Sequence, residues 1–126
     1  DVEFLIPSQL EEQYTKEGKE IPKPIKVKAQ IDTGASHSVV QEDIPKKLGL
    51  RPVGQITVNT PSTTSHPCYQ YFIRMFIPQM NISYEGLFTA LPLGSQTPNC
   101  LIGRNMLQYG VFIYNGAANQ FTLCLL

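Results

Sequence analysis

The sequence predicts a mainly β domain with a closed or sandwiched sheet and only one or two short helices. Short apolar runs recur between turn residues, and the clearest of them alternates apolar and polar side chains with a period of two. Helix signals are confined to short stretches. A chain of 126 residues has the length of one domain, so we treat residues 1–126 as a single unit, with an N-terminal strand and polar extension over 1–24 and a core over 25–126.

The N-terminal extension leaves two alternatives open. Residues 2–6 are typical of a short strand. Ser8 and Glu11 have the spacing of a capping box, which favours a short helix in the polar stretch that follows. Residues 16–19 are equally typical of a hairpin turn, and the sequence does not decide between the two.

The strand over residues 25–31 is the clearest element. Its apolar members alternate with polar residues and are expected to face a core: Ile25, Val27, Ala29 and Ile31. Gln30 and Asp32 then share the opposite, open face. Further strands are expected at 38–40, 55–59, 69–77, 81–90, 111–114 and 121–126, an apolar run ending on glycine at 101–103, and short helices at 42–48 and 104–108. The last two strands form a hairpin.

Charge is balanced over the whole chain but unevenly distributed. Ten Lys and Arg residues balance ten Asp and Glu residues, which argues against a nucleic-acid partner and against a polybasic membrane surface. Residues 52–126 hold only Arg74, Glu85 and Arg104. Such a charge-poor surface predicts contact with something other than water, and a second copy of the chain is the simplest candidate. No apolar run is long enough to span a membrane.

The three cysteines, Cys68, Cys100 and Cys124, cannot form a complete set of intrachain disulfides. We therefore expect reduced thiols and a cytoplasmic location, with Cys124 packed in the last strand. His37 and His66 are expected to be exposed loop residues. No metal site and no cofactor are expected, because nothing near His66 supplies two further ligands.

The strongest functional signal is Asp32-Thr33-Gly34-Ala35, at the end of the alternating strand. Aspartic proteolysis requires a carboxylate in a tight turn, close to a second carboxylate. Gly34 lets backbones approach closely, and Thr33 supplies a hydroxyl that can brace the loop. The tripeptide Asp32-Thr33-Gly34 alone is a weak signal for an aspartic protease. The strand expected before it, the strand and helix expected after it and a second motif downstream strengthen this signal.

A second motif, Thr-Pro-Asn-Cys-Leu-Ile-Gly-Arg-Asn-Met-Leu, occupies residues 97–107 and contains the apolar run that ends on glycine. This glycine lies 71 residues after Asp32. The two motifs at this spacing resemble the retropepsins, the retroviral and retroviral-like aspartic proteases. The resemblance covers residues 25–126 and is closest to cellular, bacterial-type members.

The resemblance implies a small closed-barrel acid-protease fold assembled as a homodimer, because one chain carries one catalytic aspartate, Asp32. The two Asp32 carboxylates would flank a water and share one proton. The ionised one would activate the water for attack on a peptide bond. The resemblance also implies an active-site loop (Thr33, Gly34, Ala35), a support behind it that joins the dimer network (Leu101, Ile102, Gly103, Arg104), a substrate pocket (Gln30, Asn99, Leu101) and a flap (Ser62, Thr63, Thr64, Ser65).

Some residues depart from the family pattern. Ser36 stands where viral enzymes have an acidic partner for the arginine, which leaves the dimer role of Arg104 open. The flap loop has no glycine, which indicates a lid that closes differently. Gln30 and Asn99 indicate a more polar pocket than is usual. Ala35 replaces the hydroxyl residue of pepsin-like relatives, so we expect a working range nearer neutral pH.

Two functions of different classes follow. The first is an aspartic endopeptidase that cleaves peptide or protein substrates. The second is a catalytically silent retropepsin-like domain that dimerises or holds a peptide, because a fold alone does not confer activity. The intact Asp32-Thr33-Gly34 favours the enzyme, and the glycine-free flap slightly favours the binding domain. An unrelated β domain with a chance motif is the third interpretation.

Overall fold

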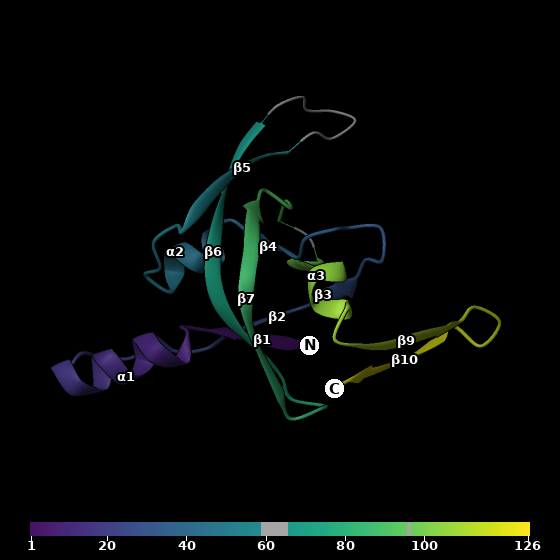
Figure 1. Cartoon of the computed structure of the whole chain (residues 1–126), viewed down its shortest axis with the longest axis horizontal. Helices are drawn as coiled ribbons and strands as arrows, with labels where there is room; N and C mark the ends of the chain where they lie inside the picture. The colour runs from purple at the N-terminus through teal and green to yellow at the C-terminus, as the bar shows by residue number, and fades with distance from the viewer. Residues whose placement is uncertain (59–65, 96) are drawn as a thin grey trace.

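Figure 1 shows a mainly β protein, as the sequence predicts, in a computed structural model that describes residues 1–58, 66–95 and 97–126. Within these ranges the chain forms one large sheet, a separate two-stranded sheet and three helices. The elements in chain order are β1 (Val2–Leu5), α1 (Ser8–Glu17), β2 (Ile25–Val27), β3 (Ala29–Ile31), β4 (Val39–Gln41), α2 (Asp43–Lys47), β5 (Gly54–Val58), β6 (His66–Ile77), β7 (Ile82–Leu91), β8 (Cys100–Ile102), α3 (Arg104–Leu107), β9 (Gly110–Asn115) and β10 (Gln120–Leu125).

The large sheet curls into a nearly closed barrel. Its strands run in the order β2-β1-β6-β7-β4-β8-β3, and β5 pairs with β6 off this path. The strands at the two ends of this order, β2 and β3, are consecutive in the chain and are separated only by Lys28. The predicted strand over residues 25–31 is therefore broken at Lys28, where the chain changes its pairing partner from β1 to β8. This change of partner brings the two ends of the sheet together.

The core fills the inside of this curled sheet. Phe4 of β1 and Phe88 of β7 are fully buried and meet edge to face, with ring centroids 5.3 Å apart. Burial of each large apolar side chain of this kind contributes roughly 1.5–3 kcal/mol. The apolar members of the predicted alternating strand pack against this core as expected, at Ile25, Val27, Ala29 and Ile31.

The N-terminal extension forms a helix, which decides between the two alternatives that the sequence left open. α1 begins at Ser8 and is followed by Gly18 in the left-handed conformation (φ 69°). No side chain caps its first turn, so the expected capping box is wrong. Glu11 instead forms an ion pair with Arg74 of β6, and the Ser8 N–H donates to the Glu85 carboxylate of β7. The described residues thus contain three helices, whereas the sequence predicts one or two.

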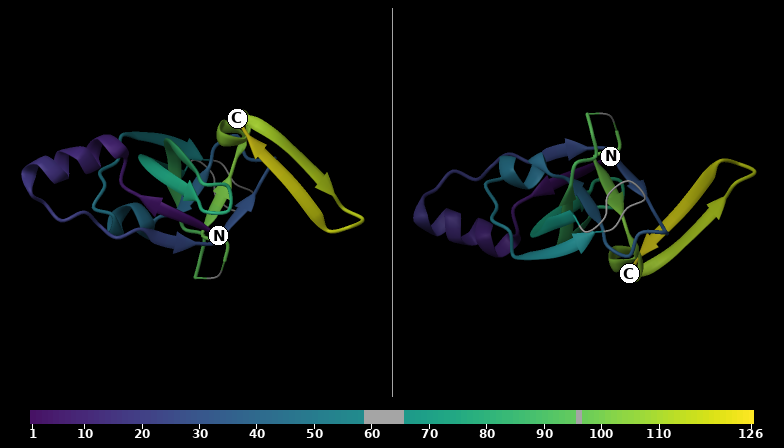
Figure 2. Two further views of the ribbon diagram at one scale, coloured as in Figure 1. Left: turned by 90° about the horizontal axis from the view of Figure 1, so that it is seen from below. Right: turned by 90° about the horizontal axis from the view of Figure 1, so that it is seen from above.

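β9 and β10 form the predicted hairpin, hereafter the C-terminal arm (residues 110–125). Within the described residues these strands pair only with each other. Figure 2 shows the arm projecting from the barrel on the side opposite α1. Residues directly opposite in an antiparallel pair share a face. The inner face, which borders a cavity against β3, carries Phe112, Tyr114, Phe121, Leu123 and Leu125, and the outer face carries Val111, Ile113, Thr122 and Cys124.

The strands on either side of the predicted flap also form a hairpin. β5 pairs antiparallel with the beginning of β6, from Gly54 opposite Gln70 to Val58 opposite His66. The residues assigned to the flap itself, Ser62, Thr63, Thr64 and Ser65, lie outside the described residues. Of the helices that the structure describes, none has the length and apolar character needed to cross a membrane.

Candidate active site

The two sequence motifs lie side by side at the end of a parallel strand pair. β3 and β8 run parallel, with Ile31 opposite Ile102. The Asp32 N–H donates to the Ile102 carbonyl at 2.9 Å, which extends the pairing by one residue. Because the strands are parallel, the segments that follow them, 32–35 and 103–105, meet at the same edge of the sheet.

Asp32 begins a tight turn. Its side-chain Oδ1 accepts a hydrogen bond from the Gly34 N–H at 3.0 Å, and its carbonyl accepts one from the Ala35 N–H at 3.2 Å. A Cβ at position 34 would lie 3.2 Å from Oδ1 of Asp32, so glycine leaves the carboxylate uncrowded. Asp32 is half-buried and Thr33 is exposed. The turn therefore holds a carboxylate in a fixed position that solvent still reaches.

The second motif supports this turn from behind. A Cβ at Gly103 would lie 2.7 Å from the carbonyl group of His37 and 2.9 Å from that of Ala35, so no side chain fits there. The Arg104 N–H donates to the Ala35 carbonyl at 2.9 Å, and Nη1 of Arg104 donates to the Thr33 carbonyl at 2.9 Å. Arg104 thus binds the backbone of the Asp32 turn in its own chain.

A buried polar network behind the turn was missed by the sequence analysis. Ser38 is fully buried, and its N–H and hydroxyl both donate to Oδ1 of Asn105 at 2.8 Å. The Ser38 hydroxyl oxygen accepts the Gly103 N–H at 3.0 Å, and Nδ2 of Asn105 donates to the Leu87 carbonyl at 3.3 Å. The available signal was the asparagine of the second motif, but its partner becomes evident only in the fold.

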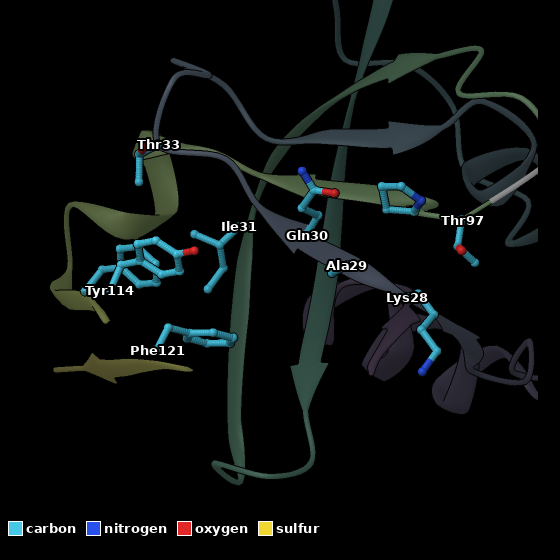
Figure 3. Close-up of a pocket in the computed structure, with 10 residues that line it drawn as sticks. Lys28, Ala29, Gln30, Ile31, Thr33, Thr97, Tyr114 and Phe121 are labelled. Carbon is cyan, nitrogen blue, oxygen red and sulfur yellow. The ribbon is translucent and has the colours of Figure 1, made fainter. Parts of the chain in front are cut away.

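A cavity of about 620 Å³ runs along β3 beside the turn (Figure 3). At one end Tyr114 and Phe121 of the arm lie against Ile31, Gln30 follows next along β3, and Thr97 and Lys28 lie at the other end. The full lining is Lys28, Ala29, Gln30, Ile31, Thr33, Thr97, Pro98, Phe112, Tyr114 and Phe121. We refer to the two parts as the aromatic end and the polar end. Ligand pockets commonly have about 300–1,000 Å³, so this cavity has the size of a binding site.

The three residues predicted for the substrate pocket do not line one cavity. Gln30 lines the cavity along β3, and Leu101 lies opposite it in register on β8 without lining this cavity. Asn99 lines a different cavity, of about 440 Å³. Thr97 and Pro98, which precede Asn99 in the second motif, line the first cavity instead. Of the predicted pocket, the structure thus brings only Gln30 to the cavity beside the turn.

All three cysteines are described, and no disulfide joins them. Cys68 and Cys100 are buried, and burial raises the pKa of both thiols, that of Cys100 to about 12. Both thiols are therefore protonated and unreactive near neutral pH. Cys124 is exposed on the outer face of the arm, so the expectation that it packs in the last strand is wrong. His37 is exposed, as predicted. The described residues contain no group of three or more His, Cys, Asp or Glu side chains that could hold a metal ion.

Comparison with protein-family models, with curated proteins and with solved structures finds no match to this chain. The fold and site define a mainly β protein with a nearly closed barrel and an aspartate turn supported by a Gly-Arg-Asn segment.

Proposed function

We propose that this chain is an aspartic endopeptidase of the retropepsin type that works as a homodimer. The observation that carries the proposal is the Asp32 turn, in which Gly34 binds the carboxylate and Ile102 and Arg104 hold the backbone. Each chain has one such turn. We infer that a second copy supplies the other carboxylate, because closed two-fold dimers are the commonest assemblies and place identical groups on both sides of one axis.

In the proposed mechanism the two Asp32 carboxylates share one proton, because two like charges so close together do not both ionise. The ionised carboxylate takes a proton from water, and the water oxygen attacks the scissile carbonyl carbon. The protonated carboxyl donates a hydrogen bond to the carbonyl oxygen. The tetrahedral intermediate then loses the amine as the C–N bond breaks and the nitrogen gains a proton. One water is consumed, and an acid and an amine are formed.

The surroundings of the turn support this chemistry by holding the carboxylate still. Displacement of a catalytic group by 1 Å can lower the rate about 100-fold. The contacts from Gly103 and Arg104 and the buried Ser38–Asn105 pair connect the turn to two strands and a helix. Gln30, which lines the adjacent cavity, supports a preference for a substrate side chain that forms hydrogen bonds.

The test is cleavage of a broad peptide library from about pH 3 to pH 8, at several protein concentrations. We expect cleavage that Asp32→Asn abolishes, that statine-type inhibitors block, and that rises faster than linearly with concentration. Asp43→Asn is the matched control, because it removes a carboxylate that pairs with Lys47 at 2.9 Å in α2. A folded, dimeric wild type that cleaves nothing would instead favour a catalytically silent domain that dimerises or binds peptides.

A further inference from the structure

A second cavity, of about 440 Å³, lies beside β2 and contains no residue of the aspartate turn. β2 is an end strand of the large sheet, and among the described residues it pairs only with β1. All three of its residues, Ile25, Lys26 and Val27, border the cavity. Successive side chains of a strand point to opposite faces, so a cavity that reaches all three residues runs along the edge of the strand. We call this cavity the edge slot.

The free edge of β2 offers unpaired backbone groups to the edge slot. In an antiparallel pair only every second residue exchanges hydrogen bonds with its partner, so the other N–H and C=O groups of β2 point away from β1. Within the described part of the chain, the backbone of residues 25–27 forms no hydrogen bond beyond the pairing with β1. An open edge of this kind is a template for an extended peptide, whose own backbone supplies the missing partners.

The wall that faces β2 carries a fixed hydrogen-bond donor. Oε1 of Gln41 accepts the Leu93 N–H at 2.6 Å, and the Gln41 N–H donates to the Asn99 carbonyl at 2.9 Å. Nε2 of the same half-buried side chain forms no hydrogen bond to the described residues, so this donor is available to a ligand. The edge slot therefore has backbone partners on one side and a side-chain amide on the other.

The charges around the edge slot favour an acidic ligand. Lys26 forms no ion pair with the described residues, whereas Lys47 of α2 is paired with Asp43 at 2.9 Å. Glu3 lies opposite Lys26 on β1 and offsets part of its charge. The segment that completes the wall is uncharged over residues 86–103. An acidic side chain beside Lys26 therefore gains attraction, and a basic one meets repulsion.

The edge slot and the cavity beside the aspartate turn meet at one corner of the chain. β2 borders the edge slot and β3 borders the other cavity, and Lys28 between the two strands lines the polar end of that cavity. On the facing segment Pro98 lines the cavity beside the turn, and Asn99 lines the edge slot. An extended peptide advances about 3.3 Å per residue, so a chain that leaves the polar end past Lys28 reaches the edge slot within a few residues.

We propose that the edge slot binds an extended acidic segment of a polypeptide, which adds to β2 as a further strand and places a carboxylate beside Lys26. The binding itself rests on the edge of β2, on Gln41 and on Lys26, and it needs neither the catalytic carboxylate nor a second chain. The assignment of this segment to a substrate, a few residues away from the bond that is cleaved, rests on the proposed function. The edge slot then selects protein substrates by a stretch outside the cleavage site.

The binding is tested in the Asp32→Asn chain, which under the proposed function does not cleave the probe. The probe is the peptide acetyl-Thr-Val-Glu-Val-Thr-amide, with counterparts that carry Gln or Lys in place of Glu and one in which every backbone nitrogen is methylated. We expect NMR shift changes at the backbone amides of β2 and at the side-chain amide of Gln41. The Glu peptide should bind about threefold or more tightly than the Gln peptide, the Lys peptide more weakly still, and the methylated peptide not at all.

Lys26→Gln is expected to abolish the preference for the Glu peptide. Lys46→Gln is the matched control, because Lys46 is an exposed lysine of α2 that does not line the edge slot, and it should keep the preference. Three outcomes would overturn the edge slot as a binding site. They are shift changes confined to β3 and residues 97–98, equal binding of the Glu and Lys peptides, and equal effects of the two lysine variants.

The role in substrate selection is measured with the best peptide from the cleavage library, extended at either end by a flexible spacer and the acidic segment. We expect one of the two extensions to lower KM about threefold or more at unchanged kcat, because the segment binds substrate and transition state equally. Lys26→Gln should remove this gain. Equal KM values with and without the extensions would overturn the link to substrate. A wild type that cleaves no peptide would remove the proposed function alone, since shift changes at β2 still support the edge slot.

Discussion

The side-chain oxygen of Asn105 accepts two hydrogen bonds from Ser38, one from its N–H and one from its hydroxyl, each at 2.8 Å. The pair connects the beginning of β4 to α3. The Ser38 hydroxyl oxygen also accepts the N–H of Gly103, whose backbone lies directly behind the Asp32 turn. Because Ser38 is fully buried, no solvent replaces these bonds when one partner is removed.

We therefore expect Ser38→Ala to lower the free energy of unfolding by about 1–3 kcal/mol, because it leaves the buried Gly103 N–H without an acceptor. Ser36→Ala is the matched control, since Ser36 is exposed and its hydroxyl contacts only the neighbouring His37 ring among the described residues. Its effect is expected within about 0.5 kcal/mol. Urea unfolding of both variants at one protein concentration measures the difference, and equal effects would contradict the prediction.

Thr89 carries a second buried hydroxyl, and its removal is expected to stabilise the protein, in contrast to removal of the Ser38 hydroxyl. Thr89 is 2% exposed, and its Oγ1 has no hydrogen-bond partner within the described part of the chain. Thr89→Val removes this unpaired group and is expected to raise the free energy of unfolding by about 1 kcal/mol. The same urea series measures it. A loss of stability would show that the hydroxyl has a partner that the described residues do not include.

Local patterns predicted the elements, whereas the contacts between them depended on the fold. The alternation over residues 25–31 identified the half-buried strand, but its break at Lys28 follows from a change of pairing partner, which leaves no mark in the alternation. The two motifs were recognised from their spacing. The structural role of Ser38 was not recognised, because its hydrogen-bond partner Asn105 is 67 residues away and the sequence alone does not connect the two. The predicted substrate pocket was only partly correct for a related reason: which cavity a side chain lines depends on the fold. Pro98 and Asn99 are neighbours in the sequence, yet they line different cavities.

Gly103→Ala is expected to disrupt the site because its Cβ would lie 2.7 Å from the backbone of His37, which cannot move without moving the turn. Overpacking of this kind costs about 1–3 kcal/mol, and the displaced turn should also lose cleavage activity. In Gly116→Ala, the control, the nearest atom to the new Cβ is a Tyr114 ring carbon at 3.5 Å, an ordinary contact. Thermal unfolding and peptide cleavage compare the two, and a Gly103→Ala variant as stable and active as Gly116→Ala would contradict the packing argument.

Glu85 is expected to make the attachment of α1 depend on pH. Burial acts to raise the pKa of Glu85, but hydrogen bonds from Ser8 and the charge of Arg74 outweigh it, and the net pKa is lowered. A lowered pKa stabilises the folded state above the unfolded value, about 4.3 for Glu, and this stability is lost as the pH falls through the folded value. The melting temperature should therefore drop more steeply below about pH 4.3 in wild type than in Glu85→Gln.

Glu20→Gln is the control for this pH dependence, because Glu20 is an exposed carboxylate in the segment that follows α1. Its melting temperature should follow the wild-type profile over the acid range. Identical profiles for wild type and Glu85→Gln would show that the Ser8 contact does not contribute to stability.

Ala35→Ser tests the expected working range of the proposed enzyme. A hydroxyl at this position can donate to the catalytic carboxylates, and a donor favours their ionised form, whereas alanine has no donor to offer. We therefore expect the acidic limb of kcat/KM in wild type to lie nearer neutral than in pepsin-like enzymes. In Ala35→Ser this limb is expected to move to lower pH, while Ser36→Ala, one residue further on, should leave it in place. The pH profiles of the three chains with one peptide substrate measure the shift, and a wild-type limb already at pepsin-like pH would remove the role given to Ala35.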